Sequence, residues 1–173
     1  MASDERTANL LGALALTLAG RTGSAARDRA DVASSDAAAL VTLRNYAEGR
    51  PLSLLSDALG LSQPGTVRLV DRLERRGFVE RHRSDEDARA VGLRLTEAGR
   101  RAAGAALAAR AGALETALGA LSHAERRTLD GLLAKMLAAE TTDAVSSLYI
   151  CRMCDPDACG HPERCPVTQA ARG

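Results

Sequence analysis

The chain has 173 residues, a formal net charge of +1, 46% hydrophobic residues and only 2% aromatic residues. This length allows one domain, or one domain with an appendage. Because aromatic residues are so few, the core must be built from leucine, valine and alanine. The small net charge excludes nucleic-acid binding through bulk charge alone, and the sequence has no run of about 18 apolar residues that could span a membrane. Acidic Asp4 and Glu5 precede the short apolar stretch 10–18, unlike a signal peptide, so we expect a cytoplasmic protein.

The N-terminal part of the chain predicts two helices, since alanine and leucine are strong helix formers. Residues 4–20 are expected to form the first helix, with Gly20 as its stop signal, and residues 21–33 a loose connection. A second helix is expected over residues 34–48, and its N-cap is expected to be one of three polar residues, Ser34, Ser35 or Asp36.

Two helices joined by a tight turn are predicted next. Residues 52–59 form the first of them, Gly60 closes it, and Ser62 is a natural N-cap for the second, which runs to about Arg76. Two short strands and a long helix follow, expected at residues 79–83, 90–95 and 96–119. This order is typical of a winged helix-turn-helix, a fold that binds duplex DNA.

The second helix of this pair has two different faces. Val67, Val70 and Leu73 recur at helical spacing and are expected to face the core. The opposite side carries basic residues that suit the DNA major groove, namely Arg68, Arg72 and Arg75. An ordinary solvated helix face would show the same pattern and remains the alternative.

The start of this helix is the end expected to enter the groove. Glutamine can read adenine there, and arginine can read guanine through paired hydrogen bonds. Ser62 and Thr66 are expected to hold phosphates, which set register and not sequence. The predicted DNA-binding residues are therefore Ser62, Gln63, Thr66, Arg68 and Arg72 in this helix, and Arg83 and Arg89 in the hairpin.

Between Ser62 and Arg94, eight arginines face only six acidic residues, a surplus of two, so the charges must be sorted onto different faces. The hairpin loop alone carries three acids, which is unusual so close to DNA. We expect them to pair with Arg81 or Arg83, and to lower the affinity for DNA if they do not. They are Asp85, Glu86 and Asp87.

The first helix and the last two long helices are more apolar than one small lobe can cover. Ser122 and Glu125 have the spacing of a capping box at the start of the final long helix, which carries leucines through Leu137. Pairing of two copies would bury this surface, and a symmetric dimer would match a symmetric DNA site.

All four cysteines lie close to the C-terminus, as Cys151, Cys154, Cys159 and Cys165, with His161 between the last two. Such spacing can wrap one Zn²⁺ ion through all four thiolates, or through three of them and His161. Cys165-Pro166 also matches the last ligand of some iron–sulfur motifs. Redox chemistry at Cys151 and Cys154, with Arg152 lowering a thiol pKa, is the third alternative.

Six segments stand in a characteristic order along the chain: Gly60-Leu61-Ser62-Gln63, Thr66-Val67, Val70-Asp71-Arg72-Leu73-Glu74, Arg76-Gly77-Phe78-Val79-Glu80-Arg81, Asp87-Ala88-Arg89 and Leu95-Thr96-Glu97-Ala98-Gly99-Arg100. Together they resemble the MarR family of bacterial transcription regulators, over about residues 36–137. The resemblance implies a homodimer with interleaved terminal helices, in which each copy reads half of a near-palindromic operator. It also implies repression that a small ligand, an oxidant or a metal relieves.

The same resemblance implies roles for two hairpin residues. Arg89 matches the wing arginine that enters the minor groove, where narrow grooves concentrate negative potential. Asp87 matches the acid that fixes the loop through a salt bridge. The cysteine-rich tail departs from the common family pattern.

We therefore expect a mainly α (α+β) protein with four parts, namely an N-terminal dimerisation helix and connection (1–33), a winged helix-turn-helix (34–100), C-terminal dimerisation helices (101–145) and a cysteine-rich tail (146–173). The predicted function is a DNA-binding regulator whose partners are double-stranded DNA, a second copy and a small-molecule inducer. A protein-interaction module is the alternative, and a small thiol oxidoreductase is a weaker one. With no Ser/His/Asp set and no glycine-rich phosphate loop in the sequence, no enzymatic activity is expected.

Overall fold

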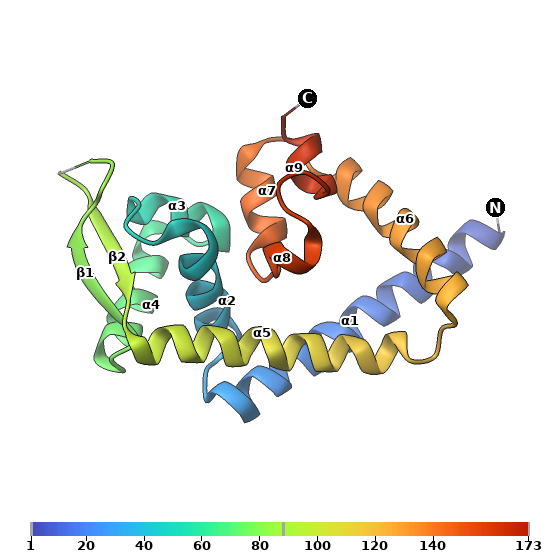
Figure 1. Ribbon diagram of the computed structural model, residues 1–173, viewed down its shortest axis with the longest axis horizontal. Coiled ribbons are helices and arrows are strands. Elements are labelled where there is room, and N and C mark those ends of the chain that lie inside the picture. The colour runs from blue at the N-terminus through green and yellow to red at the C-terminus, as the bar shows by residue number, and fades with distance from the viewer. Residues whose placement is uncertain (1, 88, 173) are drawn as a thin grey trace.

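Two long helices extend from a small winged lobe, and a compact C-terminal tail fills the angle between them and the lobe (Figure 1). This computed structural model describes residues 2–87 and 89–172, so Ala88 of the expected hairpin loop lies outside the described residues. The elements are α1 (Ala2–Ala30), α2 (Ser34–Thr42), the π-helix η1 (Leu43–Ala47), α3 (Leu52–Leu59), α4 (Gln63–Arg75), β1 (Val79–Arg83), β2 (Val91–Leu95), α5 (Glu97–Leu118), α6 (His123–Glu140), α7 (Ala144–Cys151), α8 (Pro156–Cys159) and α9 (Pro166–Ala170). Within the described residues, no helix is both long enough and apolar enough to cross a membrane.

The core of the winged lobe is aliphatic, as the composition requires. Leucines from α2, η1, α3, α4 and β2 meet there and are almost completely buried: Leu40, Leu43, Leu55, Leu73 and Leu93. Each buried leucine contributes roughly 1.5–3 kcal/mol by leaving water. This core holds α4 and the two strands in one rigid unit.

The helix-turn-helix forms as predicted. Gly60 ends α3 in the left-handed conformation, with φ of 63°, and the Ser62 side chain accepts a hydrogen bond from the backbone of Gly65 at the start of α4. The caps of the later helices are also confirmed, with Thr96 before α5 and the Ser122–Glu125 capping box before α6.

The hairpin lies directly against the lobe. β1 and β2 pair antiparallel, with Arg81 opposite Leu93 and Arg83 opposite Val91. Gly92 permits this close packing, because a Cβ atom there would lie 2.9 Å from the carbonyl oxygen of Gly49. The wing is therefore held at its base by backbone contacts.

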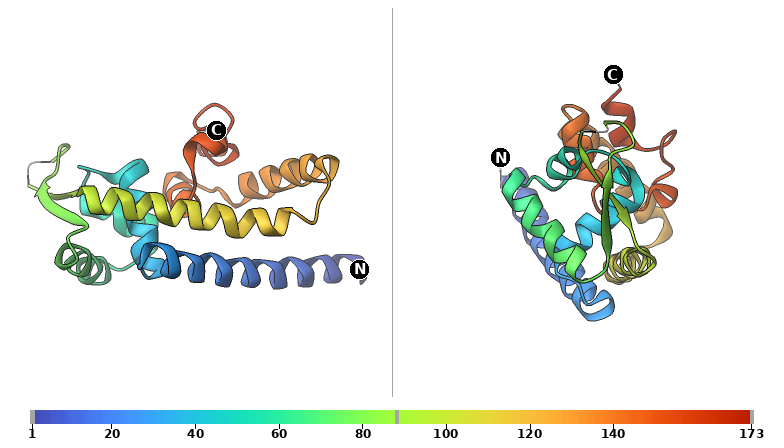
Figure 2. Two further views of the ribbon diagram at one scale, coloured as in Figure 1. Left: turned by 60° about the horizontal axis from the view of Figure 1, so that its bottom comes forward. Right: turned by 90° about the vertical axis from the view of Figure 1, so that its left-hand side faces the viewer.

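Three predictions about the N-terminal half are wrong. Helix α1 does not stop at Gly20 but continues to Ala30, because alanine and arginine sustain the helix and α5 packs along it (Figure 2). None of the three expected polar caps begins α2; its N-cap is Ala33. The second helix also changes to a π-helix at Leu43.

The exposed face of α4 is also shifted from the prediction. Val67 is 41% exposed, while Leu69 takes the expected place in the core beside Val70 and Leu73. Thr66 is completely buried as well. The helix is therefore rotated so that Val67 joins the edge of the solvent face.

A buried ion pair joins α2 to α4. Asp36 is only 1% exposed, and the Arg72 guanidinium donates to it through Nε, at 3.1 Å from Oδ1. This bond raises the pKa of Arg72 above its ordinary value. Arg76 reaches only to 4.0 Å from the same carboxylate, so Arg72 is its main partner.

We expect Arg72→Ala to destabilise the fold, because it leaves the buried Asp36 carboxylate without its main partner. The loss should be about 2–4 kcal/mol in the free energy of unfolding, measured with urea. Arg75→Ala on the exposed side of the same helix is the matched control and should stay within about 0.5 kcal/mol of the parent. Equal effects of the two substitutions would contradict this role.

Candidate nucleic-acid interface

The solvent face of α4 carries the predicted polar residues. Gln63 and Arg68 are exposed, and Arg75 lies seven residues after Arg68, so the two arginines share one side of the helix. Ser62 is exposed just before them. The sequence placed Arg75 on this side but not among the DNA contacts, although its spacing from Arg68 is the signal that would have included it.

Two predicted contact residues have other tasks. Thr66 is completely buried, and its hydroxyl donates to the backbone carbonyl of Ser62 at 3.2 Å. Its predicted phosphate contact does not fit this position. Arg72 is engaged by Asp36, so its role is to position α4, and the prediction that it reads a base does not fit either.

Two acidic residues of the wing loop form internal ion pairs. Asp85 pairs with Arg94 at 2.9 Å, and Glu86 pairs with Arg50 at 2.7 Å. The expectation that the loop acids would pair with Arg81 or Arg83 is therefore wrong. Arg81 instead binds the two acids on the exposed side of α4, Asp71 and Glu74.

The wing presents two exposed arginines, Arg83 and Arg89. Asp87 does not form the expected salt bridge; its Oδ1 accepts a hydrogen bond from the backbone N–H of Arg89 at 2.8 Å. This bond shapes the loop and leaves the Arg89 guanidinium outward. Across the part of the chain that the structure describes, no ion pair occupies Arg68, Arg75, Arg83 or Arg89.

Glu48 holds the wing in place relative to the lobe. Its carboxylate accepts bonds from the Arg100 guanidinium at 2.7 Å and from the Leu95 backbone N–H at 3.0 Å. The hydrogen bond from Arg100 lowers the pKa of Glu48 below its ordinary value. One side chain thus ties the end of η1 to both β2 and α5.

The four cysteines form a second cluster, in the tail. Cys151 and Cys165 are buried, and Cys154 and Cys159 pack against them. The neighbouring Cys151 thiol lowers the pKa of Cys154 to about 6, with further help from the positive charges of Arg110 and Arg152.

His161 has partners of its own in this region. Its Nδ1 lies 2.9 Å from the Thr168 hydroxyl, and its ring meets Tyr46 edge-on, with 6.2 Å between the ring centroids. Among residues 2–87 and 89–172, no three histidine, cysteine, aspartate or glutamate side chains already stand as ligands around one point.

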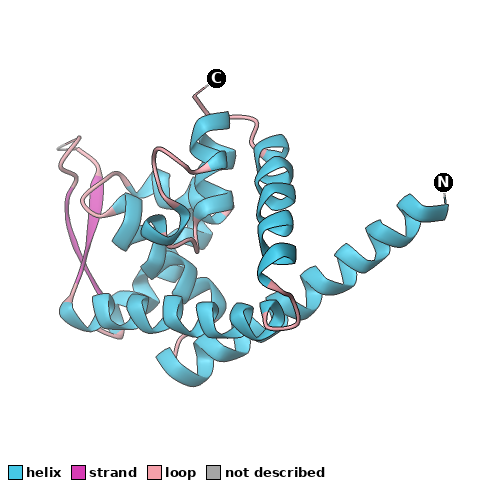
Figure 3. Ribbon diagram, turned by 45° about the vertical axis from the view of Figure 1, so that its right-hand side comes forward, coloured by secondary structure: helices cyan, strands magenta, loops and turns pink. Residues whose placement is uncertain are grey.

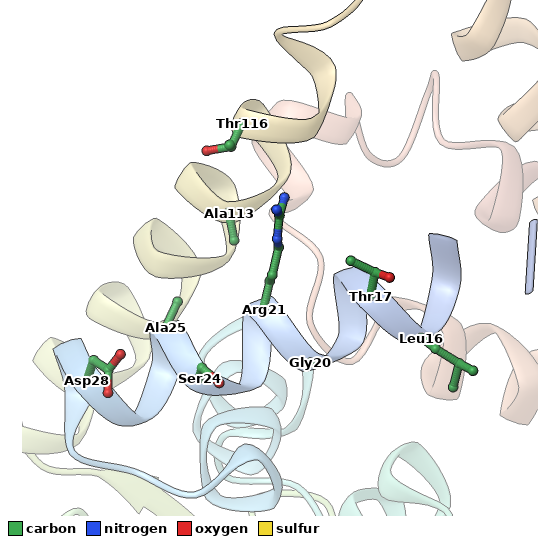
Figure 4. A pocket seen from close by; sticks show the side chains of 9 residues that line it. All are labelled: Leu16, Thr17, Gly20, Arg21, Ser24, Ala25, Asp28, Ala113 and Thr116. Atoms are coloured by element: carbon green, nitrogen blue, oxygen red, sulfur yellow. The ribbon is translucent and has the colours of Figure 1, made fainter. Parts of the chain in front are cut away.

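A pocket of about 550 Å³ lies between α1 and α5, where Arg21 extends from α1 toward Ala113 and Thr116 of α5 (Figure 4). Asp28 lies at its other end. The pocket thus offers one cation and one anion between two long helices.

Comparison with known proteins agrees with this geometry. A model of the MarR family matches residues 30–90. The transcriptional repressor MprA of Escherichia coli (strain K12) is 37% identical over 102 residues, which are 58% of this chain and 57% of that protein. This chain thus spans little more than half the length of that relative.

Solved structures extend the likeness beyond the lobe. The match with a MarR family protein from Bacillus stearothermophilus covers 81% of this chain and 96% of that protein's chain, with 26% identity and a TM-score of 0.72. The match with CouR from Rhodococcus jostii RHA1, bound to p-coumaroyl-CoA, covers 73% of this chain and 88% of the CouR chain, with 25% identity and a TM-score of 0.60.

Fold and site together define a winged helix-turn-helix protein. The chain carries a MarR-family domain, and the family resemblance found in the sequence is confirmed.

Proposed function

We propose that this protein is a sequence-specific DNA-binding transcriptional regulator that acts as a homodimer and represses its target. One observation carries the proposal: Arg68 and Arg75 of α4 and Arg83 and Arg89 of the wing form no ion pair within the described residues, while four acids beside them, Asp71, Glu74, Asp85 and Glu86, are bound by other arginines. A chain with a net charge of +1 thereby presents a locally basic surface at one end, where the wing projects beside α4 (Figure 1).

Each exposed group on this surface suits a different part of duplex DNA. Gln63 and Arg68 face outward near the start of α4, where a recognition helix meets base edges in the major groove. Ser62 and Arg75 suit phosphates, which fix the register. Arg89 extends from the wing loop and suits a narrow minor groove, with Arg83 beside it on the strand.

The homodimer rests on apolar surface that one chain leaves open. Leucines of α1 are 44–79% exposed at Leu10, Leu11, Leu14 and Leu16, and α6 has a similar row at Leu132, Leu133, Met136 and Leu137. Exposed apolar rows on two long helices mark a protein–protein contact. A two-fold dimer would place two copies of α4 and the wing on a two-fold DNA site.

Repression and its release rest on the relatives. MprA is named as a transcriptional repressor, and CouR holds p-coumaroyl-CoA. The pocket between α1 and α5 lies beside the exposed α1 leucines, so a small molecule bound there would act on the dimer contact. A small-molecule inducer therefore remains part of the proposal. The location that fits these properties is the cytoplasm, where DNA is accessible.

We expect Arg68→Ala and Arg89→Ala each to weaken binding to a duplex selected by this protein from random DNA. The loss should be about 1–3 kcal/mol for an arginine that reads a base, measured by fluorescence anisotropy at fixed salt. Arg75 is expected to contact a phosphate, so Arg75→Ala should weaken binding to all sequences alike and reduce the salt slope by about 1.

The matched control is Arg127→Ala, an exposed arginine of α6 far from the wing (Figure 1). It should leave DNA affinity unchanged. The proposal fails if selection enriches no sequence, or if Arg68→Ala and Arg89→Ala bind the selected duplex as tightly as the control. A protein-interaction module would give that result.

We expect Met136→Glu to weaken the dimer by about tenfold or more, because burial of an unpaired carboxylate costs on the order of several kcal/mol. Sedimentation equilibrium measures this, and cooperative binding to the two half-sites should weaken with it. Val145→Glu, at an equally exposed apolar residue of α7, is the control. A wild-type chain that sediments as a monomer at micromolar concentration would contradict the dimer.

A further inference from the structure

The C-terminal tail has a core made largely of sulfur. Cys151, Cys165 and Val167 are its buried residues, and Cys154, Cys159 and Tyr46 pack against them. The helices around this core are short, four residues in α8 and five in α9, joined by loops (Figure 3). Helices of that length are unstable alone in water.

So small a core is not enough to order the segment by hydrophobic burial. Folded units below roughly 40 residues usually need disulfides, a metal ion or a partner. The four cysteines are free thiols and thus provide no disulfide. Their convergence in one short segment is the feature that a bound metal explains.

The thiols belong to two short stretches of the tail. Cys151 and Cys154 stand at the two sides of the turn after α7, where the Cys154 backbone N–H donates to the Cys151 carbonyl at 2.9 Å. Cys159 and Cys165 stand at the two ends of the loop between α8 and α9. Cys154 and Cys159 both pack against the buried cluster that contains Cys151 and Cys165, so the two pairs face one interior.

We propose that Cys151, Cys154, Cys159 and Cys165 bind one zinc ion through four thiolates. Zinc prefers tetrahedral sulfur ligands at about 2.3 Å, which places two sulfurs of one site about 3.8 Å apart. Four thiols that share one small core can reach this arrangement, with each pair supplying one edge of the tetrahedron. Binding releases the thiol protons to solvent and draws the two pairs together.

Two alternatives fit the structure less well. His161 is held by Thr168 and Tyr46, which favours four thiolates over three thiolates and an imidazole. A [4Fe–4S] cluster places each of its four cysteine ligands on a separate iron atom, so four cysteines around one small core suit a single ion better. A four-thiolate zinc site carries a double negative charge, and Arg110 and Arg152 are cations that act on Cys154.

The proposed site is joined to the DNA-binding lobe through the turn at Cys154. Thr42 Oγ1 donates to the Arg152 carbonyl at 3.2 Å, and Asn45 Nδ2 donates to the Cys154 carbonyl at 2.9 Å. Thr42 directly precedes the π-helix η1, and Asn45 lies within it. Tyr149 of α7 also packs closely against Gly60 at the end of α3. A Cβ atom at Gly60 would lie 3.1 Å from the Tyr149 ring. Zinc would therefore hold the tail against η1 and α3.

Metal analysis of the full chain, purified without added metal or chelator, tests the proposal directly. We expect a colourless protein with one zinc per chain. Removal of zinc with a chelator should lower the melting temperature and expose the tail to protease, and zinc should restore both. Cobalt(II) added to the chelated protein should give the absorption of a tetrahedral cobalt–thiolate site.

Cys154→Ser and Cys159→Ser should each lose the metal, while His161→Ala should keep one zinc per chain. If the serine variants do not fold, the cobalt titration of chelated wild-type protein decides. A brown protein with iron and sulfide, disulfides in place of free thiols, or a stable protein that binds neither zinc nor cobalt would overturn the proposal. Metal content is measured without DNA, so this result is independent of the proposed function.

Discussion

The arrangement of the winged lobe depends on one buried charge. Asp36 lies at the start of α2 with only 1% of its surface exposed, and a carboxylate in that position must be paired. Its partner Arg72 comes from the last turn of α4, so the pair sets how α4 is rotated against α2. That rotation puts Thr66 and Leu69 inside and turns Arg68 outward. Arg72, which looks like a DNA contact in the sequence, thus serves to orient the exposed face of α4.

The same logic applies to the other charges of the lobe. Asp85, Glu86 and Glu48 each take an arginine that would otherwise face solvent, and in doing so they tie the wing loop, η1, β2 and α5 together. Exposed ion pairs of this kind add little stability individually. Their effect on the electrostatic field is larger, because they neutralise acids close to α4 and the wing, where four exposed arginines form no ion pair within the described residues. A net charge near zero is therefore compatible with a basic binding surface.

Local signals in the sequence predicted most of the fold. Ser62, Thr96 and Ser122 each cap the helix that was expected after them, because a cap depends only on residues within one turn. Long-range partners were not predictable. Nothing near Arg72 indicates that its partner lies 36 residues earlier, and nothing near Thr66 distinguishes a hydroxyl that bonds its own helix from one that bonds a phosphate. The continuation of α1 beyond Gly20 was also not predictable, because it depends on a long-range contact. Packing along α5 outweighs the local cost of a glycine in the helix.

In the tail, the spacing of the cysteines indicates a candidate site in the sequence. The contacts that join this site to the rest of the protein cannot be predicted from the sequence. The cysteine pattern identified the donors, but Asn45 and Thr42, which hold the turn at Cys154, have no signal of their own in the sequence. Their position matters for regulation. A ligand that binds only the docked tail stabilises that docked form by mass action. It changes DNA affinity only if the docked and undocked forms differ in how α3 and α4 sit. Because the tail contacts η1 and the end of α3, and α3 leads directly into α4, that difference has a short physical route.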